Sequence, residues 1–384
     1  MARLLGLRIQ NYKALADVSI GQVGYGQGTP LPLLSCFIGP NGSGKSTLLD
    51  AFGFMADCLR EGVEAACDKP QRNGFAKLRT QGCFDPIRFE LYYRESQQSR
   101  PITYSFAVDE LAGVPVVVEE TLRQRRKGQK HGRPFPFLRL EKGEGRVWAG
   151  DATEDEEGAT SLDVGLDDVG RLGITTLGQL KEHPRIVGLR SYIENWYLSY
   201  FVPDAARSLP TAGAQKHLTR SGENLGNVVQ YLERTHPDSF QKVLNGIARK
   251  IPGVHSISHE KSPDGRLLLQ FNEQGYKDPF YQQSMSDGTL KMFAYLILLE
   301  ELAREFIRHS EENQDRTQVF ITTHSPYFVD ALRPDQVWLM EKDEEGVTQV
   351  RRTADIPVVK AMIDEGIPLG SLWYSNHFDE RFPR

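Results

Sequence analysis

The sequence has little of what marks secreted and membrane proteins. Its 384 residues include four cysteines and no C-x-x-C pair, so we expect neither a disulfide framework nor a zinc site. No apolar run approaches the roughly 20 residues that span a bilayer, and the amino terminus lacks a signal peptide's apolar segment. An excess of positive charge is also absent, because the net charge is −5; contact with nucleic acid would need a local basic patch. We therefore expect a cytoplasmic protein without a membrane segment.

Repeats, heptads and long low-complexity segments are missing as well. The composition, 39% hydrophobic and 25% charged, is that of an ordinary globular protein long enough for one large core or two domains. Hydrophobic periodicity predicts strands at 87–94, 102–108, 114–122, 135–148, 200–202 and 267–271, and a hairpin at 337–352. It predicts helices at 176–198, 223–234, 237–250 and 288–309. Residues 62–82 and the acidic 151–168 read as irregular, exposed segments.

One stretch stands out, GPNGSGKST at residues 39–47. It fits G-x-x-x-x-G-K-[ST], a loop whose glycines let backbone N–H groups surround an anion. An apolar strand is predicted at 33–38 before it, and a helix with an apolar face follows it, so a chance match in a glycine-rich turn is disfavoured. We predict that Lys45 contacts the β- and γ-phosphates of ATP and that Ser46 binds Mg²⁺. The predicted nucleotide-binding residues here are Gly39, Asn41, Gly42, Ser43, Gly44, Lys45, Ser46 and Thr47.

Two later stretches have weaker signals. SMSDGTLK, at 284–291, opens the predicted 288–309 helix and offers a second phosphate-facing helix terminus, although S-D-G-T by itself is a common helix cap. The predicted strand 319–323 ends at His324, which places an imidazole at the edge of the sheet where α/β proteins bind ligands. A lone histidine there is more often structural than catalytic. Because the three stretches occur in this order along the chain, we favour a functional role for them over a purely structural one.

In this order the three stretches resemble the ATPases of the ABC superfamily, and most of all the RecF/SMC-type, AAA_21-like predicted ATPases of bacteria. LRIQNYKAL at 7–15 resembles the first strand and turn of that group, and GPNGSGKST its phosphate loop. SMSDGTLK resembles its signature motif and TTHSPYFV at 322–329 its switch-histidine segment. The likeness covers about 1–60 and 220–352. Without a C-x-x-C hook or a coiled coil, the chain resembles a short-armed member.

The resemblance implies an α/β fold: a P-loop ABC-type ATPase head, with a mixed sheet and flanking helices, formed by residues 1–75 and 220–384. Residues 76–219 would be an inserted arm, β-rich and helical. It also implies a head-to-head dimer that encloses ATP and Mg²⁺. Ser286 and Gly288 of one copy would cap the γ-phosphate held by the other, and His324 would sense it, with Lys45 as the second catalytic residue. Gln81 is a candidate for the loop glutamine that positions Mg²⁺ and water; an exposed loop residue is an equal alternative.

One expected element is missing. The family has an apolar strand ending in Asp-Glu between the signature helix and the switch histidine, and its carboxylates hold Mg²⁺ and activate water. The elements involved need on the order of 50 residues, but only Leu290 to Gln318 lie between. LILLEE at 296–301 has apolar residues followed by acidic ones, as the expected strand would. Its apolar positions, however, continue the apolar face of the predicted helix. Two explanations remain: the chain binds ATP with little or no hydrolysis, or a stretch near Leu299–Leu302 is missing from this sequence.

A basic segment, residues 123–133, is predicted at the tip of a hairpin, and its cations are Arg123, Arg125, Arg126, Lys127, Lys130 and Arg133. It is a candidate contact for DNA or RNA phosphates or for an acidic effector protein, and a solvated loop is the alternative. Three hypotheses follow. The first is a RecF/SMC-like ATPase whose ATP-driven dimerisation controls DNA or an effector, in DNA repair or anti-phage defence. The second is an ATP-binding scaffold without turnover, and the third is the ATPase subunit of a transporter.

Overall fold

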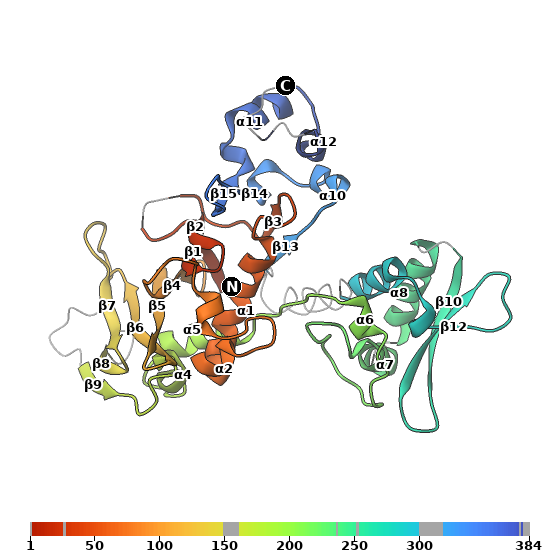
Figure 1. Ribbon diagram of the computed structural model, residues 1–384, viewed down its shortest axis with the longest axis horizontal. Coiled ribbons are helices and arrows are strands. Elements are labelled where there is room, and N and C mark those ends of the chain that lie inside the picture. The colour runs from red at the N-terminus through yellow and green to blue at the C-terminus, as the bar shows by residue number, and fades with distance from the viewer. Residues whose placement is uncertain are drawn as a thin grey trace. The chain divides into compact units, whose positions relative to one another are not determined.

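The computed structural model describes residues 2–25, 28–148, 161–235, 237–250, 253–298, 318–375 and 378. Contacts along the chain divide it into two compact units (Figure 1). Unit 1 is Met1–Trp196 with Thr317–Arg384, and unit 2 is Tyr197–Arg316. No helix in the described part of the chain is both long and apolar enough to cross a bilayer.

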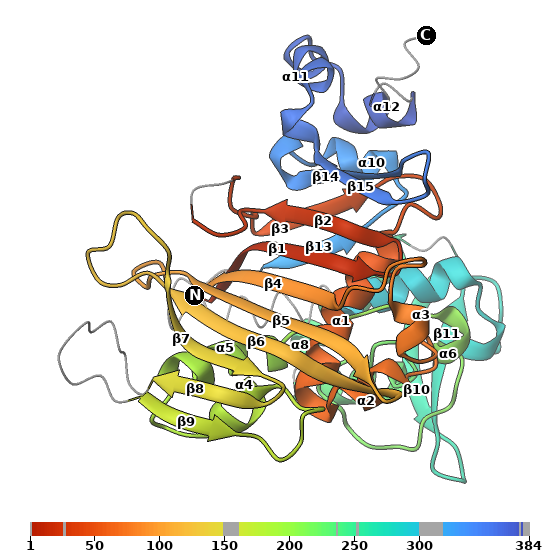
Figure 2. The same cartoon turned by 60° about the vertical axis from the view of Figure 1, so that its left-hand side comes forward.

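Unit 1 contains an eight-stranded antiparallel sheet whose order is β2-β1-β4-β5-β6-β7-β8-β9 (Figure 2). Its strands are β1 (Arg3–Tyr12), β2 (Leu15–Gly21), β4 (Ile87–Arg94), β5 (Ile102–Leu111), β6 (Val114–Gln124), β7 (Phe135–Glu141), β8 (Glu144–Trp148) and β9 (Ser161–Gly165). Side chains alternate between an apolar and a polar face, as expected for a half-buried antiparallel sheet. On the apolar face, the Phe89 ring of β4 lies 5.1 Å from Phe106 and 5.7 Å from Phe54. Phe54 belongs to helix α1 (Lys45–Glu61), which therefore packs on this sheet.

A second sheet in unit 1 has the order β13-β3-β14-β15. Its strands are β3 (Leu34–Ile38), β13 (Val319–Thr322), β14 (Val337–Lys342) and β15 (Thr348–Arg352). Both neighbours of β3 run parallel to it, and β15 returns antiparallel to β14. Short helices complete the unit: α2 (Val63–Cys67), α3 (Phe75–Leu78), α4 (Gly173–Leu177), α5 (Pro184–Glu194), α10 (Pro326–Asp330), α11 (Pro357–Asp364) and α12 (Leu369–Tyr374). The parallel strands place the carboxyl ends of β3 and β13 at one edge.

Unit 2 is a separate small α/β body. It contains α6 (Pro203–Ala206), α7 (Leu225–Thr235), α8 (Pro237–Lys250) and a sheet of β10 (Val254–Lys261), β11 (Leu267–Glu273) and β12 (Phe280–Tyr281). Residues 287–298 are helical. Their apolar face supplies Phe293, whose ring lies 5.5 Å from Phe271 of β11, and Ile297 to a core shared with α7.

Several predicted elements are confirmed: the strands around β3, β4, β5, β6 and β11, the helices α7 and α8, and the β14–β15 hairpin. Four expectations were wrong. Segment 135–148 is two strands, because Lys142 with φ 50° and Gly143 with φ 80° form a tight turn inside it. The predicted helix 176–198 is two shorter helices, α4 and α5. Residues 200–202 are not a strand, and 62–82, expected to be irregular, contains α2 and α3.

The two units do not follow the boundaries expected at 75/76 and 219/220. Strands β4 to β9 were assigned to an arm, but β4 pairs directly with β1 and extends the first sheet of the head. Hydrogen bonding between strands distant in sequence decided this, and periodicity cannot show it. The second half of the predicted 288–309 helix and most of the acidic 151–168 segment lie outside the described residues.

Candidate nucleotide-binding site

The loop between β3 and α1 has the backbone of an anion-binding turn. Gly42 and Gly44 have φ of 81° and 100°, in the left-handed region that favours glycine. Gly44 precedes α1, so the first N–H groups of that 17-residue helix face the loop. The strand, glycine loop and helix predicted from the sequence are confirmed as one continuous unit, which removes the alternative of a chance match.

Close packing explains why two of the glycines must lack a side chain. A β-carbon on Gly39 would lie 2.0 Å from the carbonyl oxygen of Met340, on β14. A β-carbon on Gly44 would lie 2.6 Å from Oγ1 of Thr348, on β15. The Thr348 hydroxyl in turn donates a 3.0 Å hydrogen bond to the carbonyl of Ser43. The hairpin β14–β15 therefore packs against the loop and supports its backbone.

Lys45 occupies the centre of the loop. Its ammonium donates hydrogen bonds to the carbonyl oxygens of Gly39, at 2.9 Å, and Pro40, at 2.8 Å. The residue is 6% exposed, and this burial lowers the pKa of the Lys45 ammonium from its ordinary value. A buried cation beside a helix amino terminus is a favourable place for the phosphates of a nucleotide.

His324 lies near Lys45. It follows β13, which pairs with β3 in parallel, so both the loop and the histidine are at the same edge of the sheet. Partial burial, and then the positive charge of Lys45, lower the pKa of the His324 imidazole. Both effects favour the neutral imidazole, although the residue keeps much of its contact with solvent. The structure thus brings together the two residues that we predicted to be catalytic.

The remaining loop residues are suited to a magnesium-bound triphosphate. Asn41, Gly42 and Ser46 are exposed and Thr47 is half-buried, so the Ser46 hydroxyl is available to a metal ion. Among the described residues, no group of three His, Cys, Asp or Glu side chains could hold a metal by itself. Mg²⁺ characteristically takes one or two protein oxygens and fills its other positions with phosphate oxygens and water. The loop fits that requirement.

Ser286 and Gly288 belong to unit 2. The Ser286 hydroxyl accepts a 3.2 Å hydrogen bond from the N–H of Thr289 and caps the helix at 287–298. Asp287 beside it is held by Arg207, whose Nη2 lies 2.5 Å from its carboxylate. A γ-phosphate contact by these residues stays a prediction.

Gln81 is exposed, in the turn before β4. The N–H of its neighbour Thr80 donates to the carbonyl of Asn11, near the end of β1, at 3.0 Å. The turn after β1 in its own right approaches the support of the nucleotide loop, because the N–H of Thr348 donates to the carbonyl of Ala14 at 3.0 Å. The role of Gln81 as a metal-positioning residue stays a prediction.

Neither strand beside β3 carries an Asp-Glu pair in the described part of the chain. Strand β13 reads VFIT, and β14 reads VWLMEK with a single carboxylate, Glu341. Glu341 accepts a 2.8 Å ion pair from Arg351 on β15. The catalytic carboxylate that the resemblance requires is therefore not supplied by these strands.

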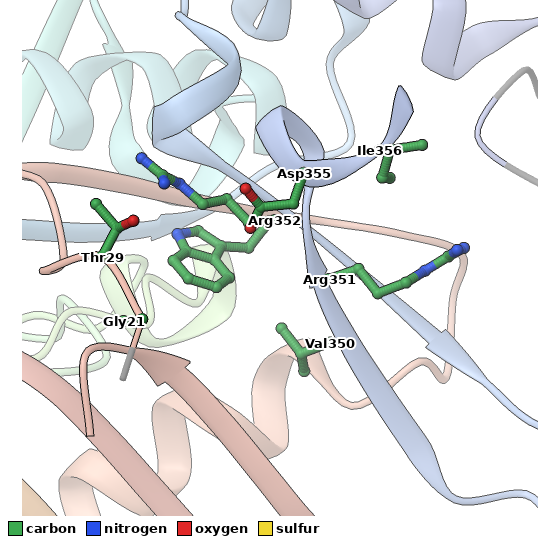
Figure 3. Close-up of a pocket in the computed structure, with 9 residues that line it drawn as sticks. Gly21, Thr29, Val350, Arg351, Arg352, Asp355 and Ile356 are labelled. Carbon is green, nitrogen blue, oxygen red and sulfur yellow. The ribbon is translucent and has the colours of Figure 1, made fainter. Parts of the chain in front are cut away.

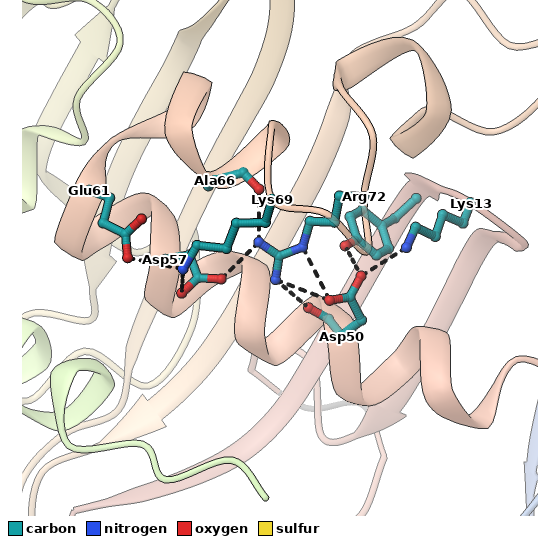
Figure 4. A network of polar contacts seen from close by, with 8 residues as sticks. Lys13, Asp50, Asp57, Glu61, Ala66, Lys69 and Arg72 are labelled. Atoms are coloured by element: carbon teal, nitrogen blue, oxygen red, sulfur yellow. Dashed lines mark hydrogen bonds and ion pairs between the residues drawn. The ribbon is translucent and has the colours of Figure 1, made fainter. Parts of the chain in front are cut away.

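Helix α1 is fixed by an ionic network that sequence analysis did not identify (Figure 4). Arg72, in the turn between α2 and α3, bridges Asp50 and Asp57 of α1 at 3.0 and 2.8 Å. Lys13 and Lys69 pair with the same two carboxylates at 2.9 and 2.8 Å. Asp50 and Asp57 lie on one face of the helix two turns apart, but nothing in the sequence identified their partners.

A cavity of about 440 Å³ lies elsewhere in unit 1, beside β15 (Figure 3). Gly21 and Thr29 line one side of it, and Val350, Arg352 and Asp355 line another. None of the predicted site residues lines this cavity. The predicted nucleotide site lies at the edge of the second sheet, where β3 ends.

Residues 34–303 match the family described as "AAA domain, putative AbiEii toxin, Type IV TA system". The chain belongs to this family. The matched region includes the glycine loop and Ser286, and it ends before His324. The AAA_21-type ATPase domain predicted from the motifs is thus confirmed, and nucleotide binding follows from membership. No curated protein matches the chain.

Among the solved structures that match, we describe three that are similar to this AAA-domain protein. One is the "SmcHead bound to the C-winged helix domain of ScpA", with 14% identity, a TM-score of 0.41, and coverage of 91% of this chain and 97% of that chain. Another is an Smc head domain with a coiled coil and joint from Pyrococcus yayanosii, with 12% identity, a TM-score of 0.39, and coverage of 95% and 100%. The third is the recombination mediator RecF with ATP, with 10% identity, a TM-score of 0.36, and coverage of 91% and 99%. Over the whole chain, these are distant likenesses.

Proposed function

We propose that this AAA-domain protein binds ATP with Mg²⁺ at residues 39–47 and that ATP controls its self-association. The observation that carries the proposal is the position of Lys45 and His324 at one edge of the β3 sheet, beside the amino terminus of α1. Lys45 and the loop N–H groups would hold the phosphates, Ser46 would bind Mg²⁺, and His324 would contact the γ-phosphate. Gln81 would position Mg²⁺ and water.

The proposed self-association is a dimer that depends on Ser286 and Gly288. They would close on the nucleotide held by a second copy, so that each ATP contacts two protomers. A ligand that binds the associated form in preference to the monomer shifts the equilibrium toward association. In this scheme residues 1–75 and 220–384 would form the functional head, with β4 to β9 joined to it through the sheet of β1. We place the protein in the cytoplasm, in bacterial DNA repair or anti-phage defence; the family's description, which includes a putative toxin, fits the second setting.

Lys45→Ala tests the site directly. ATP binding is measured by calorimetry with Mg²⁺, and association by light scattering with and without ATP. Wild type should bind ATP and increase in mass, whereas Lys45→Ala should do neither. Lys77→Ala is the matched control, because Lys77 is an exposed lysine on α3. Equal ATP binding by wild type and Lys45→Ala would refute the proposal.

A second candidate is an ATP-binding scaffold that does not turn ATP over. The sequences of β13 and β14, which lack an Asp-Glu pair, favour it. Phosphate release separates the two candidates: turnover that disappears in Lys45→Ala excludes the scaffold, and tight ATP binding without phosphate release supports it. Either outcome leaves the nucleotide site itself in place.

A further inference from the structure

One end of the eight-stranded sheet collects arginines that are far apart in the sequence. The strand register pairs Arg3 of β1 with Arg94 at the end of β4, and Tyr93 with Ile102 at the start of β5. It continues from Ile102 to Gln124 at the end of β6 and from Gln124 to Phe135 at the start of β7. Segments 94–101 and 123–135 therefore lie together at this end. Five adjacent strands contribute to this end, namely β1, β4, β5, β6 and β7, and together they span roughly 19 Å at ordinary strand spacing.

The charge at this end is strongly positive. The two segments contain one carboxylate, Glu95, and the cations Arg94, Arg100, Arg123, Arg125, Arg126, Lys127, Lys130 and Arg133. Arg3 adds another, and its neighbour Arg94 is one cause, after burial, of the lowered pKa of the Arg3 guanidinium. The net charge of the whole chain is −5, so this local concentration of positive charge is opposite in sign to the charge of the chain as a whole. We name these nine residues the arginine end.

The base of the arginine end is held in place by contacts between its two segments, so it is not merely a solvated loop. The Tyr25 hydroxyl donates a 2.6 Å hydrogen bond to the carbonyl of Pro101 and accepts one of 3.1 Å from the N–H of Arg125. The Arg125 guanidinium lies 4.2 Å from the centre of the Tyr25 ring. Arg100 donates a 2.6 Å hydrogen bond to the carbonyl of Arg125. These contacts hold like charges together at a cost that a bound polyanion would offset.

We propose that the arginine end binds the phosphate backbone of nucleic acid. A row of about 19 Å would face about five or six phosphates of each strand of a duplex. Residues 126–128, 130 and 133 are exposed, and neither segment carries an exposed large apolar side chain of the kind that forms the centre of a protein interface. The inference deepens the proposed function, because it selects nucleic acid over an effector protein as the partner of this ATPase.

This surface is remote from the nucleotide loop. The far end of β1, at Tyr12, leads into the turn that contacts Thr348 beside Gly44. Arg3 lies nine residues along the strand from Tyr12, which is roughly 30 Å. Substitutions at the arginine end should therefore leave ATP binding unchanged, and this separates a failure of this inference from a failure of the proposed ATP site.

The test is fluorescence anisotropy of the full-length protein with a labelled duplex and a labelled single strand, each of about 20 nucleotides, at about 50 to 200 mM salt. The variant is Lys127→Gln/Lys130→Gln/Arg133→Gln, all three exposed. Its dissociation constant should rise about tenfold or more, and its salt slope should fall by about 1 for each lost phosphate contact. A second variant, Arg94→Gln/Arg100→Gln, tests the β4–β5 side and should show the same direction of change.

The matched control is Arg139→Gln/Arg146→Gln/Arg171→Gln, which removes three exposed arginines of unit 1 and the same charge. Its affinity should stay within about twofold of wild type, and ATP binding should be unchanged in all three variants. The inference is overturned if wild type binds neither nucleic acid, or if the control weakens binding as much as the loop variant. Tighter binding of a poly-glutamate peptide than of either nucleic acid would also overturn it and would assign the surface to acidic proteins.

Discussion

Arg72 is the residue whose removal should damage unit 1 most. Its side chain is 0% exposed, and it donates to Asp50, to Asp57 and, at 2.8 Å, to the carbonyl of Ala66 (Figure 4). The change Arg72→Met keeps much of the apolar volume and removes the charge. Two largely buried carboxylates on α1 then lose their shared partner. Breaking a buried ion pair in this way costs about 3–5 kcal/mol of unfolding free energy, or on the order of 10 °C in Tm.

The pH dependence has a definite sign. Burial by itself would raise the pKa of the Asp50 carboxyl, but Arg72, Lys13 and Tyr12 outweigh it and the pKa is lowered. A lowered folded pKa stabilises the protein above the unfolded pKa, and that stability is lost as pH falls through the folded value. The difference in stability between wild type and Arg72→Met should therefore shrink in acid.

Urea unfolding followed by tryptophan fluorescence measures the effect, because Trp196 contacts Phe52 of α1 with ring centres 5.3 Å apart. Arg146→Met is the control: Arg146 is an exposed arginine paired with Asp163, and its loss should cost less than about 1 kcal/mol. Adding Asp57→Asn to Arg72→Met should recover part of the loss. A change in Arg72→Met no larger than that of Arg146→Met would refute the reasoning.

Three further predictions concern unit 1. Gly44→Ala should abolish ATP binding in calorimetry, because its β-carbon meets Thr348. The control Gly82→Ala also has a positive φ, 80°, but its β-carbon would have nothing within 4 Å. It should cost about 1 kcal/mol of stability and leave ATP binding intact. Thr348→Val loses the hydrogen bond to Ser43 and should lower stability by about 1–2 kcal/mol; an unchanged urea midpoint would contradict this. Burial raises the pKa of Glu120 from 4.5 to about 7, so its stabilising contribution is present below pH 4.5 and is lost as pH rises toward 7. Wild type should lose roughly 3 kcal/mol relative to Glu120→Gln over that window, and a difference independent of pH would argue against the shift.

Local patterns predicted local structure well. The 39–47 loop, the strand before it and the helix after it are contiguous in the chain, so glycine content and apolar periodicity sufficed. The hairpin at β14–β15 was predicted for the same reason, because its two strands are neighbours in the sequence. The predicted helix 176–198 failed because its apolar positions continue across a break, at residues 178–183, that periodicity does not register.

The candidate site was predicted in part. Lys45, Ser46 and His324 were identified, and the structure places the first and the last near each other. Thr348 was missed, because its role as a support of Ser43 depends on a contact across more than 300 positions that no spacing rule anticipates.

The sequence by itself determined that this protein has a phosphate-binding loop between a strand and a helix and that it belongs with AAA-domain ATPases. Only the tertiary structure decided that β4 to β9 extend the sheet of β1, that Arg72 fixes α1 through two carboxylates, and that separate arginines meet at one end of a sheet. The physical reason is that backbone conformation depends on near neighbours, whereas strand register and buried charge pairing depend on residues that the chain brings together only when it folds.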